Sequence, residues 1–292
     1  MNDFPKIALG TWLMGGTKDP DPNNDDEADI QKILLAIKSG VRLIDTAQNY
    51  ANGKCEELVG LAIKRLDPET ISELKILTKH SRLKLNSKQE IRSAIEGSFE
   101  RLDIDVIDYY LLHAPAENNN TIRLKNYFAV VSRFVDSGRI KNIGVSNFSI
   151  ELLEYAKKIS KYPIRVDQVS LNVFNREAID SGLLRYCQDN NIAFQAYRVM
   201  ADLTDKIKTN PVLNKLAKEK GVSNFQIAIA YVLKKGALIT VSAASQGHWR
   251  DIFSLIDGNP LSSDDVSFIE KNIASEPNPR SSMDEFINMK LG

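Results

Sequence analysis

The feature of this 292-residue sequence that most restricts its fold is a repeated alternation of short apolar segments and longer amphipathic ones. The short segments have the length and apolar character of buried strands, and the longer ones repeat apolar residues with the period of a helix. The predicted strands are Lys6 to Leu9, Val41 to Ile44, Leu74 to Thr78, the run that ends at His113, Ile140 to Val145, Ile164 to Val169, Ile192 to Tyr197 and Ala237 to Val241.

Eight strands separated by helices predict a parallel sheet with right-handed crossovers, and eight such strands close into a (β/α)8 TIM barrel, an α/β fold. An open, doubly wound sheet is the alternative. It is disfavoured because no predicted strand is followed by the Gly-x-Gly-x-x-Gly loop of nucleotide-binding sheets. We expect a single barrel domain over residues 1–292, with an extended C-terminal tail over about 277–292.

Capping signals support the helices of this pattern. Ser87 precedes Glu90 by three residues, and Ser223 precedes Gln226 in the same way, which is the spacing of a capping box at a helix N-terminus. Gly40 supplies a stop after the first amphipathic segment. The predicted helices therefore fit between the predicted strands.

The composition excludes several classes of partner. The chain has 38 basic and 38 acidic residues, so nothing indicates an electrostatic grip on nucleic acid or on an anionic membrane. Cys55 and Cys187 are too few for a disulfide scaffold and lack metal-ligand spacing, which suits a reducing compartment, and we interpret both as packing residues. The N-terminus has no signal segment and no apolar run reaches membrane-spanning length, so we expect a cytoplasmic protein.

Ionisable side chains stand at the ends of three predicted strands. The strand from Val41 to Ile44 is followed by Asp45 and then by Tyr50, and two later strands end at Lys79 and His113. Each residue alone has an ordinary explanation, as a turn cap, a core aromatic, a solvated lysine or a buried histidine. Together they indicate proton-transfer chemistry, because the chemistry of a barrel lies where its strands end.

The four side chains suit a tyrosine that acts as a general acid. A free phenol has a pKa near ~10, so it needs neighbours that stabilise its anion. We expect Lys79 to lower the pKa of Tyr50, and Asp45 to keep the lysine charged and oriented. A neutral His113 imidazole can donate a hydrogen bond to a carbonyl oxygen and orient it.

Several short motifs resemble those of the aldo-keto reductase family, and their order and spacing from about Ile7 to Ile256 are specific. They are Leu9-Gly-Thr-Trp12, Leu43-Ile-Asp-Thr-Ala47 with Tyr50, Glu56-Glu-Leu-Val-Gly60, Leu77-Thr-Lys79, Asp108-Tyr-Tyr-Leu-Leu-His-Ala-Pro115, Ile143-Gly-Val-Ser-Asn-Phe148 and Asp167-Gln168. The resemblance implies a (β/α)8 barrel that binds a nicotinamide cofactor without a Rossmann fold. It also implies a catalytic tetrad of Asp45, Tyr50, Lys79 and His113, in which Tyr50 protonates the oxygen of an aldehyde, ketone or sugar-like carbonyl as hydride reaches its carbon.

The resemblance further assigns residues to the cofactor. Ser146, Asn147 and Gln168 are expected to hydrogen-bond the nicotinamide carboxamide, and Tyr197 is expected to stack on the nicotinamide ring. A Ser-Asn pair is also common in turns and helix caps. NADP, as NADPH, is the cofactor that the resemblance implies.

The sequence departs from the family pattern around the cofactor phosphates. Arg198 begins Arg-Val-Met where the family usually has a Ser-Pro-Leu-like stretch, and Ser242 and His248 align where many members clamp the 2′-phosphate with Lys and Arg. Ser245, with backbone amides at the start of the following helix, remains to hold phosphate. Two lost cations weaken discrimination for the 2′-phosphate, so either Arg198 or Arg250 compensates or NADH (NAD) is used as well.

The substrate pocket also departs from the family pattern. Ala114 follows His113 where the family often has Trp, so a pocket bordered by Trp12 and Ala114 has room for substrates bulkier than a simple aldehyde. The polar tail from about Pro277 could cover the mouth of this pocket or could be disordered. We expect a small-molecule carbonyl substrate and a monomer or weak oligomer.

Two other functions are compatible with the sequence. One is a cofactor-binding regulatory subunit with little turnover, as in channel-associated relatives of the fold; the intact tetrad argues against it, and the altered cofactor loops argue for it. The other is a barrel metal hydrolase or isomerase, which needs clustered His and carboxylate ligands at the strand ends. His113 has only Asp45 as an acidic companion there, so we expect no metal.

Overall fold

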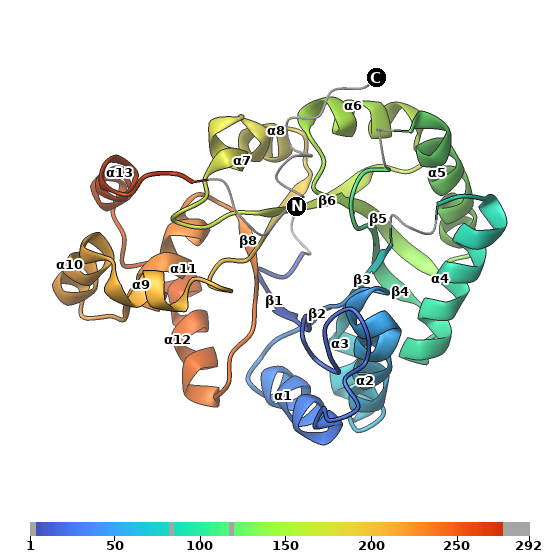
Figure 1. The fold of residues 1–292 in the computed structure, drawn as a ribbon, viewed down its shortest axis with the longest axis horizontal. Coiled ribbons are helices and arrows are strands. Elements are labelled where there is room, and N and C mark those ends of the chain that lie inside the picture. Colours follow the sequence, from blue (N-terminus) through green and yellow to red (C-terminus); the bar gives the residue numbers. More distant parts are fainter. Residues whose placement is uncertain (1–3, 82–84, 117–119, 277–292) are drawn as a thin grey trace.

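A closed barrel of eight parallel strands forms the centre of the computed structural model, which describes residues 4–81, 85–116 and 120–276 (Figure 1). Its strands are β1 (Ile7–Gly10), β2 (Leu43–Asp45), β3 (Lys75–His80), β4 (Ile107–Leu112), β5 (Ile140–Ser146), β6 (Ile164–Ser170), β7 (Ala193–Tyr197) and β8 (Leu238–Val241). Each strand pairs with the next along the chain, and β8 closes the ring on β1, where Ile239 lies opposite Ile7. The predicted (β/α)8 barrel is confirmed, and the open-sheet alternative is wrong.

Helices surround the ring of strands on its outside, as Figure 1 shows. They are α1 (Asp26–Lys38), η1 (Tyr50–Gly53), α2 (Lys54–Ile63), α3 (Pro68–Glu73), α4 (Lys88–Leu102), α5 (Thr121–Asp136), α6 (Ile150–Ile159), α7 (Glu177–Asp180), α8 (Leu183–Asp189), α9 (Thr204–Thr209), α10 (Pro211–Lys220), α11 (Asn224–Lys234), α12 (Gln246–Asp257) and α13 (Ser263–Asn272). Their buried faces pack against the outer faces of the strands in one continuous apolar core.

The two predicted helix starts are present, but only one is a complete capping box. At α11, the Ser223 hydroxyl accepts a hydrogen bond from the Gln226 backbone N–H at 3.2 Å, and the Gln226 side chain accepts from the Ser223 N–H at 2.9 Å. At α4, the Ser87 hydroxyl accepts from the Glu90 N–H at 3.1 Å, whereas the Glu90 carboxylate accepts from Asn86. Ser87 is therefore an N-cap without the reciprocal bond.

Helices α3 and α10 begin at a signal that the sequence analysis did not use. Each starts with a proline that follows Asp67 or Asn210, and these two side chains accept hydrogen bonds from N–H groups of the first turn. Proline suits the first helical position because it has no N–H that would need a partner there and its φ is already helical. At Asp67-Pro68 and Asn210-Pro211 the cap and the proline together mark the helix start.

Alternation along the strands decides which residues face the barrel interior. Successive side chains of a strand point to opposite faces, so every second residue lies inside the ring. A separate apolar cluster fills the interior, and it consists of Ala8, Leu43, Leu77, Tyr109, Leu111, Val166 and Ala193. Two residues beyond Leu43, Leu77 and Val166, the same inward positions carry Asp45, Lys79 and Gln168. The alternation therefore brings these polar side chains together at one rim.

Gly144 shows how little space remains inside the ring. A Cβ atom at this position would lie 2.4 Å from Cγ1 of Val166 and 3.1 Å from Cγ of Leu111, and the first distance is shorter than packed carbon atoms tolerate. Any side chain at position 144 would push β5 away from its neighbours. The glycine thereby allows β5 to carry Ser146, two residues further on, to the rim.

Asp167 occupies an outward position on β6 and is buried within the core. One carboxylate oxygen has no hydrogen-bond partner among the described residues, and the other receives a long contact of 3.5 Å from the Phe148 N–H. Burial raises the pKa of Asp167 well above its usual value. The carboxyl group of Asp167 therefore keeps its proton in the folded protein at pH values where it is ionised in the unfolded chain.

We expect Asp167→Asn to stabilise the protein near neutral pH. Folding raises the pKa of Asp167. The contribution of Asp167 to the stability of the fold is therefore complete only below the pKa of the unfolded chain, about 3.8, and is lost as the pH rises. Asparagine is neutral at every pH and removes this pH-linked cost, which is about 1.4 kcal/mol for each unit by which folding raises the pKa. Urea unfolding at pH 5 and pH 8 measures the difference in the free energy of unfolding between the variant and the wild type. A variant that is less stable than the wild type at both pH values would contradict the expectation.

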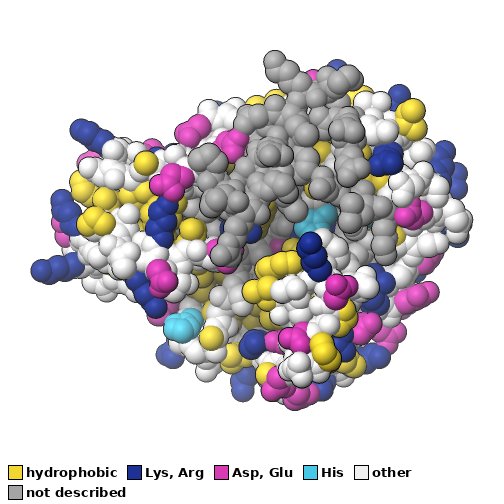
Figure 2. Space-filling model, in the orientation of Figure 1, with side chains coloured by type: hydrophobic (Ala, Val, Ile, Leu, Met, Phe, Trp, Pro, Cys, Tyr) yellow, Lys and Arg dark blue, Asp and Glu magenta, His cyan; other side chains and the backbone are white. Residues whose placement is uncertain are grey.

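Several global expectations can be compared with the described residues. Cys55 and Cys187 are both buried free thiols, in agreement with a packing role. No helix in the described ranges is long and apolar enough to cross a membrane. Figure 2 shows basic and acidic side chains intermixed over the face in view, without a broad basic area. The predicted tail over 277–292 lies outside the described residues.

Candidate active site

A cavity of about 940 Å³ lies at the C-terminal ends of the strands, where barrels carry their chemistry. Its lining includes most of the residues that the sequence predicts for catalysis and cofactor binding, namely Trp12, Asp45, Tyr50, His113, Ser146, Asn147, Gln168, Tyr197, Arg198, Ser242 and His248. Lys79 lies directly beneath this lining, fully buried, and its amine bonds Asp45 and Tyr50. The structure therefore gathers residues from seven strand ends around one space.

The Lys79 side chain links Asp45 to Tyr50. Its amine forms a buried ion pair with the Asp45 carboxylate, donates to the Thr46 carbonyl oxygen at 2.9 Å, and lies 3.3 Å from the Tyr50 hydroxyl. Three donor positions of the ammonium are thus occupied, which holds it against the phenol. A phenol with a buried ammonium at its oxygen has the arrangement of a proton donor whose anion is stabilised.

The pKa shifts of Tyr50 and Lys79 differ in part from the expectation. Burial raises the pKa of the Tyr50 phenol, and the positive charge of Lys79 opposes that rise without cancelling it. The net direction is thus upward, whereas the sequence analysis expected it to be downward. For Lys79, burial works to lower the pKa, but the Asp45 carboxylate outweighs burial and the pKa is raised. At neutral pH the phenol is protonated and the lysine is charged.

His113 lies beside the Tyr50 ring. The two rings are 5.6 Å apart between centroids in an edge arrangement, and Trp12 contacts the same phenol ring at 4.9 Å. The Nδ1 atom of His113 is 2.8 Å from the side-chain oxygen of Asn49, and the backbone oxygen of His113 accepts from Asn147 at 3.1 Å. Asn49 therefore holds the imidazole, and Asn147 holds the backbone of His113, at the cavity wall.

Polar side chains at the ends of β5, β6 and β7 form a connected group. The Ser146 hydroxyl donates to the Gln168 backbone oxygen at 2.7 Å, and the Tyr197 hydroxyl donates to the Asn147 side chain at 2.9 Å. Asn147 has a left-handed backbone with a φ of 62°, which asparagine tolerates better than most residues. These bonds fix the side chains of Ser146, Asn147 and Tyr197, which line the cavity.

Two residues that the sequence analysis missed complete the surroundings of Asp45. Its second oxygen accepts from the Gln168 amide at 2.6 Å and from the Thr240 hydroxyl at 2.9 Å, and Gln195 in turn donates to Thr240 at 2.7 Å. Thr240 and Gln195 occupy inward positions of β8 and β7. Counting back by two residues places Gln195 inside the ring from Tyr197, and Thr240 inside it from Ser242.

The residues predicted to hold phosphate separate into two groups. Arg198, Ser242 and His248 line the cavity, whereas Ser245 and Arg250 do not. Ser245 is the N-cap of α12, and its hydroxyl accepts from the His248 N–H at 3.2 Å. Arg250 is exposed. Of the two arginines that were expected to compensate for the missing clamp, Arg198 lines the cavity and Arg250 does not.

The two residues predicted to border the substrate also differ in position. Trp12 lines the cavity with 48% of its surface exposed, so its indole is available to a substrate. Ala114 is buried and is not part of the lining. Ala114 therefore does not contact the cavity. The lining gives no support to the roomier pocket that was expected from this residue.

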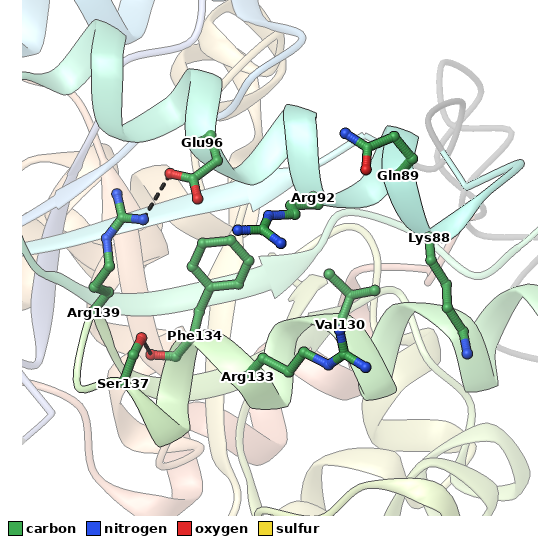
Figure 3. A pocket seen from close by; sticks show the side chains of 9 residues that line it. All are labelled: Lys88, Gln89, Arg92, Glu96, Val130, Arg133, Phe134, Ser137 and Arg139. Atoms are coloured by element: carbon green, nitrogen blue, oxygen red, sulfur yellow. Dashed lines mark hydrogen bonds and ion pairs between the residues drawn. The ribbon is translucent and has the colours of Figure 1, made fainter.

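A second hollow, of about 470 Å³, lies between α4 and α5 on the outside of the barrel (Figure 3). Its lining includes Arg92, Arg133 and Arg139, of which Arg139 pairs with Glu96 at 2.7 Å. None of the residues predicted for chemistry lies there. Among the described residues, no group of three or more His, Cys, Asp or Glu side chains is arranged to hold a metal ion.

The rim cavity, with a buried lysine against a tyrosine, thus lies where (β/α)8 barrel enzymes carry their chemistry. The chain belongs to the Aldo/keto reductase family, whose model matches residues 6–274. The predicted resemblance is confirmed, and the protein is an NAD(P)H-dependent oxidoreductase.

Named relatives match most of the chain. The aldo-keto reductase YhdN of Bacillus subtilis is 30% identical over 93% of this chain and 92% of its own. A glyoxal reductase of the same organism is 29% identical over 95% and 93%. An NADH-specific methylglyoxal reductase of Escherichia coli is 29% identical over 66% and 62%.

Solved structures agree with this assignment. The thermostable aldo-keto reductase Tm1743, in complex with the inhibitor epalrestat, has a TM-score of 0.82 and 34% identity, and the match covers 92% of this chain and 95% of that one. An aldo/keto reductase from Klebsiella pneumoniae, in complex with NADP and acetate, has a TM-score of 0.80 and 26% identity, with 94% and 93% covered.

Proposed function

We propose that this protein reduces small dicarbonyl compounds such as methylglyoxal and glyoxal to hydroxy-carbonyl products, with NADPH as the principal reductant. The observation that carries the proposal is the 3.3 Å contact between the Tyr50 hydroxyl and the buried Lys79 amine at the wall of the cavity. Relatives named as glyoxal and methylglyoxal reductases supply the substrate class. The tetrad of Asp45, Tyr50, Lys79 and His113 supplies the chemistry.

The residues around the cavity fit a nicotinamide cofactor. The Nη1 atom of Arg198 is buried without a hydrogen-bond partner among the described residues, and Nη2 has only a distant contact of 3.8 Å with Asp202. A guanidinium beside a cavity with one unpartnered nitrogen among the described residues and one long ion pair suits a phosphate group. Ser146, Asn147 and Gln168 remain the predicted contacts of the carboxamide, and Tyr197 the predicted stacking partner.

Each protein group has a separate task in this proposal. The bound cofactor supplies hydride for the carbonyl carbon. Tyr50 donates its proton to the carbonyl oxygen, and Lys79 stabilises the phenolate that remains. Asp45 keeps Lys79 charged, and His113 orients the carbonyl oxygen toward the phenol. Because the pKa of Tyr50 is raised, the phenol holds its proton across the neutral range and is ready to act as an acid.

A substrate panel tests the function. Oxidation of NADPH is followed by its absorbance with methylglyoxal, glyoxal, a simple aliphatic aldehyde, a ketone and an aldose sugar. We expect the highest kcat/KM for the dicarbonyls, because their adjacent carbonyl group activates the one that is reduced. Binding of NADPH without turnover of any member of the panel would contradict the proposal and favour the regulatory-subunit alternative.

Arg198→Ala tests the contact with the phosphate of the cofactor. We expect KM for NADPH to rise by about 10-fold to 100-fold, because hydrogen bonds to charged groups contribute about 1.5–3 kcal/mol each. KM for NADH should change less if Arg198 binds the 2′-phosphate. An equal rise for both cofactors would instead place Arg198 on the pyrophosphate that they share.

Arg250→Ala is the matched control for this experiment. It removes the same charge from an exposed position that does not line the cavity. We expect both Michaelis constants to stay within twofold of the wild-type values. A strong preference for NADPH that persists in both single variants and in the double variant would rule out compensation by either arginine.

A further inference from the structure

Asn49 holds the catalytic candidate His113 through a contact that the proposed function does not use. It precedes Tyr50 in the loop between β2 and η1, and its side-chain oxygen is 2.8 Å from Nδ1 of His113. An amide oxygen can only accept a hydrogen bond. Nδ1 must therefore carry the hydrogen in this contact, whatever the total charge of the ring.

The position of that hydrogen decides what the other ring nitrogen can offer. A neutral imidazole has one N–H, so a ring protonated at Nδ1 has a lone pair at Nε2. Such a ring can accept a hydrogen bond at Nε2 but cannot donate one to a carbonyl oxygen. Only the doubly protonated imidazolium has an N–H at Nε2 while it keeps the bond to Asn49.

We propose that Asn49 is a positioning residue that fixes the Nδ1-protonated form of His113, so that His113 donates to a carbonyl substrate only as the imidazolium. This inference rests on the proposed reduction of carbonyl compounds. It has the consequence that reduction weakens as the pH rises through the titration of His113. A neutral His113 imidazole was the expected donor, and the contact with Asn49 points instead to the imidazolium.

Among the residues that the structure describes, the groups whose contacts with His113 are shown do not titrate near neutral pH. Tyr50 presents its ring edge, and Asn147, from the end of β5, contacts the backbone oxygen. Behind Tyr50, the charges of Lys79 and Asp45 meet in their ion pair. The pKa of Tyr50 is raised above its ordinary value near 10. A loss of activity near neutral pH would therefore not come from ionisation of the phenol.

The tautomer can be measured without any turnover. In the full-length protein, ¹⁵N chemical shifts of the histidine rings are recorded above the titration, and the signals of His113 are assigned with a His113→Gln variant. We expect the neutral ring to be protonated at Nδ1 in the wild type and predominantly at Nε2 in Asn49→Leu. A wild-type ring that is protonated at Nε2 would overturn the proposal.

Activity profiles supply the second test. We expect kcat/KM of the wild type to fall by about 10-fold for each pH unit above the midpoint of the His113 titration. Asn49→Asp should move this midpoint upward by about one pH unit, since a carboxylate favours the imidazolium. Asn49→Leu should abolish the decline, because the neutral ring can then donate through Nε2. Identical profiles in all three proteins would refute the role of Asn49.

Asn23→Asp is a matched control for the added charge. Asn23 is an exposed loop residue outside the cavity lining, and its substitution should leave the midpoint unchanged. The two readouts also separate the inference from the proposed function. If no variant reduces any carbonyl, the proposed function fails, whereas the ring shifts still decide whether Asn49 sets the tautomer.

Discussion

Tyr50→Phe is expected to lower kcat/KM for carbonyl reduction by about 10²-fold to 10⁴-fold, the usual contribution of a positioned proton donor. The hydroxyl is the atom that Lys79 contacts at 3.3 Å, so its removal leaves the carbonyl oxygen without an acid. The phenyl ring keeps its contacts with Trp12 and His113, and the fold should persist. Turnover is measured by NADPH oxidation, and cofactor affinity by quenching of protein fluorescence.

Tyr162→Phe is the control for the loss of a tyrosine hydroxyl. Its oxygen bonds Asp136 at the protein surface and has no connection to the cavity. We expect this variant to keep wild-type kcat/KM. Undiminished activity of Tyr50→Phe with intact cofactor binding would falsify the assignment of Tyr50 as the acid.

Lys79→Met is expected to destabilise the fold by about 3–5 kcal/mol, because it leaves the Asp45 carboxylate buried without its counterion. Both partners are almost completely buried, at 0% and 3% exposed side chain. Asp45 would retain only its neutral donors, Gln168 and Thr240. The free energy of unfolding in urea at neutral pH measures the effect.

Two comparisons make this second prediction specific. Lys141→Met removes a lysine that pairs with Asp108 at 2.8 Å but is 59% exposed, and we expect a loss of at most about 1 kcal/mol. The double variant Asp45→Asn with Lys79→Met removes the unpaired charge and should regain most of the stability without regaining activity. Equal losses for Lys79→Met and Lys141→Met would show that the buried pair contributes little.

The fold could be predicted because strand and helix periods alternate without interruption through the chain. The strand ends at Asp45, Lys79 and His113 could be found for the same reason, since each follows an apolar run directly. Tyr50 lies five residues beyond the strand end at Asp45, at the start of η1, and its role was inferred from its grouping with Asp45, Lys79 and His113 before the resemblance to a family supported it. Periodicity alone would have left it as an aromatic residue near the core.

The contacts that orient these side chains could not be predicted, because they depend on which strands become neighbours across the ring. Thr240 and Gln195 look like ordinary polar residues within strands until the barrel closes. Asn49 gains its importance from a histidine 64 positions away. Ala114, which aligns with a family pocket position, and Arg250, which was expected to replace a lost cation, show the reverse case, because neither lines the cavity.

The closure of the ring has a consequence for the order in which this enzyme becomes active. Asp45 receives its last donor from Thr240, which follows it by 195 positions and lies on the final strand. A nascent chain on the ribosome therefore holds an incomplete catalytic centre until β8 has emerged and docked. Recovery of reductase activity during refolding should accordingly lag behind recovery of helical signal and report the arrival of that last strand.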